Sequence, residues 1–175
     1  VKHLTSSKVG DPAILSFLME WSLFKRRHLD GFHYELDADE KKLRTFVADR
    51  IVAKLSHDEI EGAARLVERL RDSIGLDPEL EKLEAGIVLL NGAREKIDFG
   101  DFDGAAMGLS EAKDRLGRKV GLIGTLEKEL KTKRKGIDPT FVKAEDALKR
   151  GDLQDAKNRL LDVLEQLPAH RGSLR

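Results

Sequence analysis

The side chains best suited to metal chemistry lie close together in the first quarter of the sequence. His28 and His33 flank Asp30, and Glu35 and Asp37 follow within a few residues. Imidazole and carboxylate groups are good ligands for Zn²⁺ and Mn²⁺. Zinc sites are usually marked by histidines four residues apart on a helix or by paired cysteines, and this segment has neither. We therefore interpret the segment as a polar loop without a metal ion.

Two other motifs that could bind an ion or a nucleotide are incomplete. Asp37-Ala38-Asp39 begins like a calcium loop, but Lys42 and Ala48 stand where such a loop needs glycine and glutamate. The glycines at positions 117, 121 and 124 follow no predicted strand and precede no Lys-Ser/Thr pair of a phosphate loop. We predict that the chain has no catalytic residue, no metal site and no cofactor, and that it is not an enzyme.

The strongest cluster of basic residues is formed by Lys128, Lys131, Lys133, Arg134 and Lys135. Such a cluster can contact phosphate groups. Cations also gather at the end of a helix because the helix dipole is negative there. Glutamates are interleaved with the cluster, and no aromatic residue is available for base stacking. We favour the structural interpretation and keep nucleic-acid contact through these residues as a third alternative.

Residues 13–24 form the most apolar segment of the chain, interrupted by Glu20 and too short to span a bilayer. A helix that is apolar on nearly every side has to be covered on every side. It is therefore either a core helix or a helix that leaves one face for a partner. Phe17, Trp21 and Phe24 are the candidate partner-binding residues, because aromatic side chains are typical interface anchors.

The composition indicates a charged helical protein. The chain has 175 residues, and its 32 basic and 32 acidic residues cancel, so no overall charge attracts it to nucleic acid or to a membrane. Cysteine is absent, which excludes disulfides. The chain begins with Val1 and shows no signal peptide, and we interpret it as a fragment or a processed form. We expect a cytoplasmic rather than a periplasmic location.

Three of the four prolines occur in an Asp-Pro dipeptide, at Asp11-Pro12, Asp77-Pro78 and Asp138-Pro139. Aspartate is a favoured N-cap, and proline suits the first helical position because it has no N–H to leave unpaired. Each dipeptide therefore predicts the start of a helix. Capping boxes at residues 37–40 and 56–59 predict two more starts.

Apolar residues recur at helical spacing through the rest of the chain, and glycines are placed where helices would end. The predicted ends are at Gly75, Gly100, Gly117, Gly136 and Gly151. No stretch alternates with the period of two that is typical of a strand. We predict an all-α fold of about eight helices in antiparallel hairpins.

Two segments, residues 100–112 and 151–163, align with each other. In each, a glycine ends one helix, an acidic turn starts the next, and an alanine follows five positions after the glycine, at Ala105 and Ala156. This pattern resembles the tetratricopeptide repeat, a helical hairpin of about 34 residues. The unit at residues 137–170 matches through Ala144, Ala156 and Pro168. The unit around Gly100 matches through the residues Ala93, Phe102, Ala105, Leu109 and Ala112.

The sequence departs from a regular repeat, because the two glycines are 51 residues apart and bulky residues are missing from the first helix of the second unit. We expect residues 1–75 to hold the apolar first helix and a capped hairpin, and residues 76–175 to hold the tetratricopeptide-like hairpins with one intervening helix. Both parts would belong to one continuous domain, a short solenoid or bundle. The resemblance implies a module that binds a protein or peptide in a groove and has no chemistry of its own. The alternative is a structural unit that oligomerises or builds a scaffold through its apolar first helix.

Overall fold

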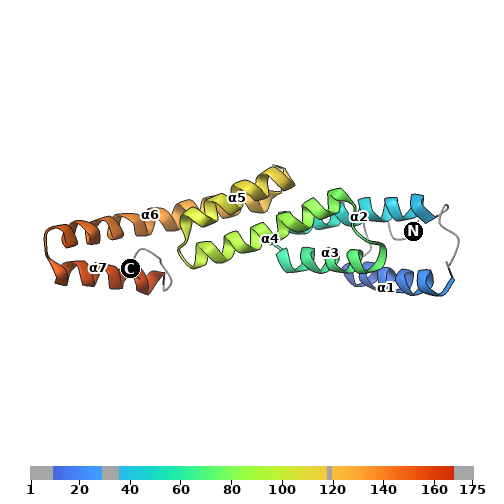
Figure 1. Cartoon of the computed structure of the whole chain (residues 1–175), viewed down its shortest axis with the longest axis horizontal. Helices are drawn as coiled ribbons and strands as arrows, with labels where there is room; N and C mark the ends of the chain where they lie inside the picture. Colours follow the sequence, from blue (N-terminus) through green and yellow to red (C-terminus); the bar gives the residue numbers. More distant parts are fainter. Residues whose placement is uncertain (1–9, 29–35, 118–119, 168–175) are drawn as a thin grey trace. The chain divides into compact units, whose positions relative to one another are not determined.

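The computed structural model describes residues 10–28, 36–117 and 120–167 of the chain. Seven α-helices make up most of this part, and no strand occurs in it (Figure 1). The helices are α1 (Asp11–His28), α2 (Leu36–Ser56), α3 (Ile60–Ile74), α4 (Pro78–Asp98), α5 (Phe102–Leu116), α6 (Gly121–Lys149) and α7 (Leu153–Gln166). The predicted all-α class is confirmed for these ranges.

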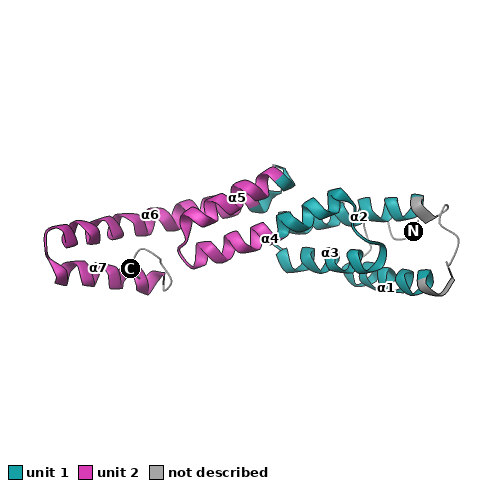
Figure 2. Cartoon of the chain, in the orientation of Figure 1, with its two compact units in different colours: residues 1–87, 115–122 teal, residues 88–114, 123–175 magenta. Residues whose placement is uncertain are grey.

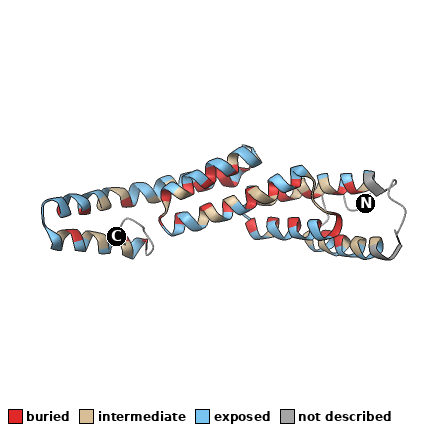
Figure 3. Cartoon of the chain, viewed as in Figure 1, coloured by how far each residue is buried: buried red, intermediate tan, exposed pale blue. Residues whose placement is uncertain are grey.

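The chain forms two compact units (Figure 2). Unit 1 consists of residues 1–87 and 115–122, and unit 2 of residues 88–114 and 123–175. Helix α4 contributes its first part to unit 1 and its second part to unit 2. Buried residues lie along one side of most helices, as expected for amphipathic helices that cover a core (Figure 3).

In unit 1, α3 packs against both α1 and α2. Along α2, Leu43, Val47, Ile51 and Leu55 form a buried stripe, and Phe46 beside them is partly buried. The facing side of α3 is formed by Ile60, Ala63, Leu66, Val67, Leu70 and Ile74, which are also buried. Burial of these side chains is the main stabilising contribution of this unit.

Polar contacts hold the ends of these three helices together. Lys54, near the end of α2, forms ion pairs with Asp11 at the start of α1 and with Glu59 before α3. Arg44 of α2 donates from Nη2 to the carbonyl of Ile74, the last residue of α3, over 2.7 Å. The first turn of α1 is thus attached to the last turn of α2 by a charge-assisted contact.

Unit 2 has a core of its own. Phe102, Ile137, Val163 and Leu167 form a buried cluster, and Leu130 and Phe141 pack against it. Helices α4 and α5 are in contact at Gly108, where a Cβ atom would lie at an ordinary van der Waals distance of 3.5 Å from the Cβ atom of Ala93.

The same short turn connects α2 to α3, α4 to α5, and α6 to α7. A residue with positive φ follows each first helix, and these residues are Asp58 (66°), Gly100 (75°) and Gly151 (80°). The N–H of the next residue donates to the carbonyl five residues earlier, and these bonds are Glu59 to Lys54 (3.0 Å), Asp101 to Lys96 (2.8 Å) and Asp152 to Ala147 (3.0 Å). This is the left-handed helix ending in which the last free carbonyls are satisfied by the turn.

Each turn is followed by a fully buried alanine, and these alanines are Ala63, Ala105 and Ala156. The sequence predicts the second and third of these hairpins from their glycines. The first hairpin is predicted from its capping boxes, but its likeness to the other two was missed because Asp58 stands in the place of glycine. Aspartate tolerates this conformation better than most residues do.

Four of the five predicted helix ends are confirmed, at Gly75, Gly100, Gly117 and Gly151, all of which have positive φ. The end predicted at Gly136 is wrong. Helix α6 continues through it and also through Pro139, so two predicted helices are one, and seven helices are described instead of about eight. The capping box at residues 56–59 is also placed too early, because α3 begins at Ile60 with Glu59 as its N-cap.

Candidate functional site

The aromatic side chains of α1 form a stacked row. The ring centroids of Phe17 and Trp21 are 5.7 Å apart, and those of Trp21 and Phe24 are 6.0 Å apart. These separations are typical of favourable aromatic pairs. Their order follows from the helix, because residues three and four positions apart lie on the same side. The structure therefore brings together the three candidate residues predicted from the sequence.

Trp21, in the middle of this row, is attached to α2 by a buried carboxylate. Its Nε1 donates to Oε1 of Glu40 over 3.2 Å. Lys25 donates to the same oxygen over 2.6 Å, and Arg44 lies 3.7 Å from Oε2. Glu40 is only 6% exposed. A buried carboxylate is stable when it has such partners, and here Glu40 joins α2 to α1 through two of them, Trp21 and Lys25, while Arg44 lies on its own helix.

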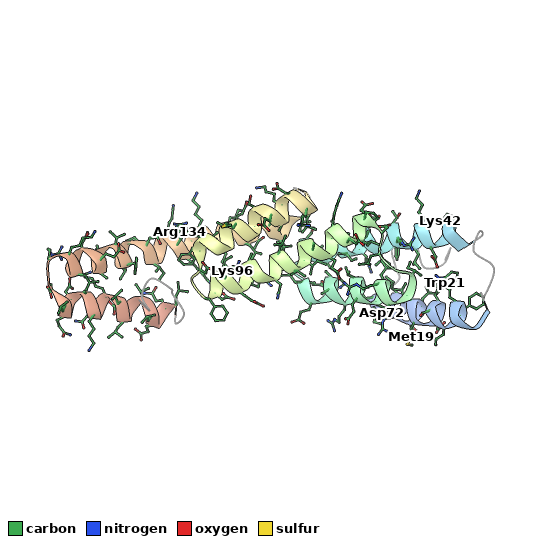
Figure 4. All side chains as sticks on the ribbon, in the orientation of Figure 1. Met19, Trp21, Lys42, Asp72, Lys96 and Arg134 are labelled. Atoms are coloured by element: carbon green, nitrogen blue, oxygen red, sulfur yellow. The ribbon has the colours of Figure 1, made fainter. Side chains whose placement is uncertain are left out.

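The opposite side of α1 is open. Ile14 and Leu18 are buried, whereas Met19 is 48% and Leu23 is 44% exposed. Figure 4 shows Trp21 on the side of α1 toward α2 and Met19 on the side away from it. The interpretation of α1 as a helix covered on every side is therefore wrong. Met19 and Leu23 each lie five residues after a buried side chain, so the helical period places them on the other side of α1 once the buried face is known.

Of the three predicted partner-binding residues, Phe24 is the most exposed, at 46%. Phe17 and Trp21 are partly buried. The side chains of α1 that a partner would reach most easily are therefore Met19, Leu23 and Phe24. The candidate loop at residues 29–35 lies outside the described residues, as does Pro168.

The basic cluster on α6 is largely compensated by carboxylates. Lys133 contacts Asp98 of α4 over 2.7 Å and Glu129 over 3.1 Å. The pKa of Lys133 is raised, mainly by its hydrogen bond to Asp98. Arg134 contacts Asp103 of α5 and Asp138, each over 3.1 Å. Each of these two cations thus lies between two acidic groups.

The other three members of the cluster form an exposed stripe. Lys128, Lys131 and Lys135 follow one another at three- and four-residue spacing, which places them on one side of α6. Within the described ranges, no carboxylate is within ion-pair distance of any of them. The field of three lysines is weakened by the surplus of carboxylates around Lys133 and Arg134, and a phosphate backbone would meet a nearly neutral surface.

A shallow pocket of about 210 Å³ lies between α5 and α6 in unit 2. Its lining consists of Ala106, Leu109, Ser110, Lys113, Glu127 and Leu130. Lys113 and Glu127 form an ion pair over 2.9 Å. The two charged side chains of the lining are thus paired with each other.

Several large apolar side chains of unit 2 also face outward. The most exposed are Val88, Phe99, Met107, Leu153 and Leu161, each more than half exposed. They come from α4, α5 and α7 and the turn after α4. Single exposed apolar residues are common in soluble proteins. They would indicate a binding site only if several of them formed one contiguous surface.

The part of the chain that the structure describes contains no candidate metal site and no candidate membrane span. No group of three or more metal-binding side chains is found there. None of the described helices has the length and apolar character needed to cross a bilayer. No family model, no curated protein and no solved structure matches the chain. Its role has to be inferred from its own residues.

Proposed function

We propose that this chain is a protein-interaction module that binds a protein or peptide partner on the surface of its helical hairpins. The observation that carries the proposal is the turn shared by α2–α3, α4–α5 and α6–α7. Chains built from repeated hairpins stack them and leave an extended surface for a partner. The inference from architecture to binding is by analogy with such proteins.

The third copy of the turn supports the resemblance to tetratricopeptide repeats. In that family, hairpins with small residues at the helix crossing form a groove that holds a peptide. Ala63, Ala105 and Ala156 are fully buried after their turns, as such crossings require. We propose a degenerate array of this kind, with a cytoplasmic location and no catalytic activity.

Site-specific photo-crosslinking tests this function. Benzoylphenylalanine would replace Met107, Leu153 or Leu161, which are exposed and apolar, with Glu165 as an exposed polar control. The proposal expects one discrete adduct with a cellular protein from some apolar positions and none from Glu165. Loss of that adduct after a charged substitution beside the reactive position would locate the surface. A uniform absence of adducts at all apolar positions would contradict the proposal.

A second candidate is self-association through α1, and it is favoured by the half-exposed side chains of Met19, Leu23 and Phe24. Standard interfaces use about 20–30 residues from each partner, so these three would form only the centre of one. Light scattering of the wild type and of Leu23→Glu separates the candidates. A wild-type dimer that becomes a monomer after this substitution supports self-association, and a wild-type monomer at high concentration excludes it. Leu23 is a better test than Trp21, because Trp21 also bonds to Glu40.

Nucleic-acid contact is the weakest of the three proposals. Lys133 and Arg134, at the centre of the predicted cluster, are already paired with carboxylates. Only the stripe of Lys128, Lys131 and Lys135 would contact phosphates. A mobility shift at low salt that is lost in Lys131→Glu would support this alternative against the main proposal.

A further inference from the structure

Helix α6 contains two residues that normally end a helix. Gly136 and Pro139 lie near the middle of its 29 residues. Proline has no N–H, so the carbonyl of Lys135 loses the partner that a regular helix would provide, and the proline ring crowds that carbonyl. A glycine in a helix interior is also unfavourable because of its backbone freedom. Both residues are exposed, so water can reach the backbone here.

The chain itself shows what the same dipeptide does at a helix start. Oδ1 of Asp77, before Pro78, accepts hydrogen bonds from the N–H groups of Glu79 (3.1 Å) and Leu80 (2.9 Å). This is an N-cap. Asp138 also precedes a proline but lies inside α6, and its Oδ2 accepts from Nε of Arg134 over 3.1 Å.

Arg134 links the two sides of this weak point. It lies one helical turn before Asp138, with Gly136 between them, and its Nη1 also donates to Oδ1 of Asp103 on α5 over 3.1 Å. The carboxylate of Asp138 has two competing uses, as a partner of Arg134 in a continuous helix or as the cap of a new helix after a break. Arg134 favours the first use.

We infer that α6 contains a hinge at residues 136–139, which exchanges between a continuous and a broken helix, and that Arg134 is the latch that holds it continuous. In the broken form, Asp138 caps a helix that begins at Pro139. The hairpin of residues 139–166 then changes direction relative to residues 123–135. Ile137, which is buried in the cluster with Phe102 and Val163, serves as the pivot. The inference does not depend on whether the chain binds a protein partner.

Spin labels on the two sides of the hinge test this inference directly. The chain has no cysteine, so Lys131→Cys and Glu145→Cys give two unique labelling sites, both on exposed side chains. In a continuous helix these Cα atoms are about 21 Å apart and nearly on one side, and a break shortens their separation. Pulsed electron resonance then measures the share of the shorter distance in the labelled chain.

Substitutions at the hinge and at the latch should change the population of the shorter distance in opposite directions. Pro139→Ala should favour the continuous form by about a hundredfold, the factor that corresponds to the helix penalty of proline relative to alanine, and should remove the shorter distance. Arg134→Gln should raise its share by about two- to threefold, as expected for an exposed pair of this spacing.

The matched control is Arg159→Gln, which removes an equivalent pair with Asp155 on α7 and should leave the distances unchanged. Circular dichroism verifies that each variant is folded. A single long distance that is identical in the wild type, Pro139→Ala and Arg134→Gln overturns the inference. An increase in the shorter distance with Arg159→Gln as large as with Arg134→Gln overturns the role of Arg134.

Discussion

Removal of the Glu40 carboxylate should weaken the attachment of α1 to α2. This residue accepts hydrogen bonds from Nε1 of Trp21 and Nζ of Lys25 and lies beside Arg44. In Glu40→Ala, all three groups lose this partner. In Glu40→Gln, the amide oxygen can still accept from Trp21, but the negative charge is absent. The two variants therefore separate the hydrogen bond from the charge.

The expected cost follows from how far each group is buried. Removal of one member of a fully buried ion pair costs about 3–5 kcal/mol, because the remaining charge is left without compensation. Here the side chains of Lys25 and Arg44 are 35% and 25% exposed, so water can partly solvate them. Hydrogen bonds to charged groups contribute about 1.5–3 kcal/mol. We expect Glu40→Ala to lower the free energy of unfolding by about 2–3 kcal/mol and Glu40→Gln by about 1–2 kcal/mol.

Trp21 provides the assay, because it is the single tryptophan of the chain. Urea unfolding followed by its fluorescence reports on unit 1, and circular dichroism follows the helices of the whole chain. Native emission should shift to the red in Glu40→Ala and only slightly in Glu40→Gln.

Asp39→Ala is the matched control, because Asp39 is the neighbouring and more exposed carboxylate near the start of the same helix. It should cost less than about 1 kcal/mol, which covers a helix-dipole effect and an exposed ion pair. Equal losses in Asp39→Ala and Glu40→Ala would refute the assigned role of Glu40.

Two further predictions concern charge and backbone. The pKa of Lys54 is raised, first by its hydrogen bond to Asp11 and then by that to Glu59. Its contribution to stability is therefore complete below the ordinary lysine pKa of about 10.4 and is lost as the pH rises through the higher folded value. Urea unfolding from pH 9 to 12 should show a smaller alkaline loss in Lys54→Gln, and equal losses would contradict this assignment. Gly136→Ala should raise the free energy of unfolding by about 0.5–1 kcal/mol, because Gly136 is helical with open space at its Cβ position. Gly151→Ala should lower the free energy of unfolding by about 1 kcal/mol, because φ is 80° there. Thermal melts in which both variants change the melting temperature in the same direction would refute this pair of predictions.

The helical class and most helix boundaries could be predicted because they depend on local chemistry. The glycines at the ends of α3, α4 and α5 need no tertiary contact to favour positive φ. Asp58 shows the limit of this reasoning. It adopts the same conformation without being glycine, and only its similarity to the other two turns identifies it. The third copy of this turn was therefore hidden in the sequence because no glycine marks it.

The candidate site could be predicted only in part, for a different reason. The apolar composition of α1 marks it as unusual, but composition does not say which face is covered. The covered face is determined in part by Glu40, which the local sequence pattern assigns to a capping box at residues 37–40. In the folded chain its carboxylate accepts hydrogen bonds from Trp21 and Lys25, both more than ten residues away in sequence. Contacts of this kind join α1 to α2 across the fold and leave no local pattern.

The three Asp-Pro dipeptides show how far one local signal decides structure. Asp77 caps α4, as its residue type predicts. Asp11 begins α1, but its carboxylate pairs with Lys54 of α2. Asp138 starts no helix, since its carboxylate is held by Arg134. The dipeptide supplies a favourable helix start of about 1 kcal/mol, and at Asp138 the exposed i,i+4 pair with Arg134 opposes it by about 0.2–0.5 kcal/mol. Removal of Arg134 should therefore shift α6 toward the local preference only by the two- to threefold expected for such a pair.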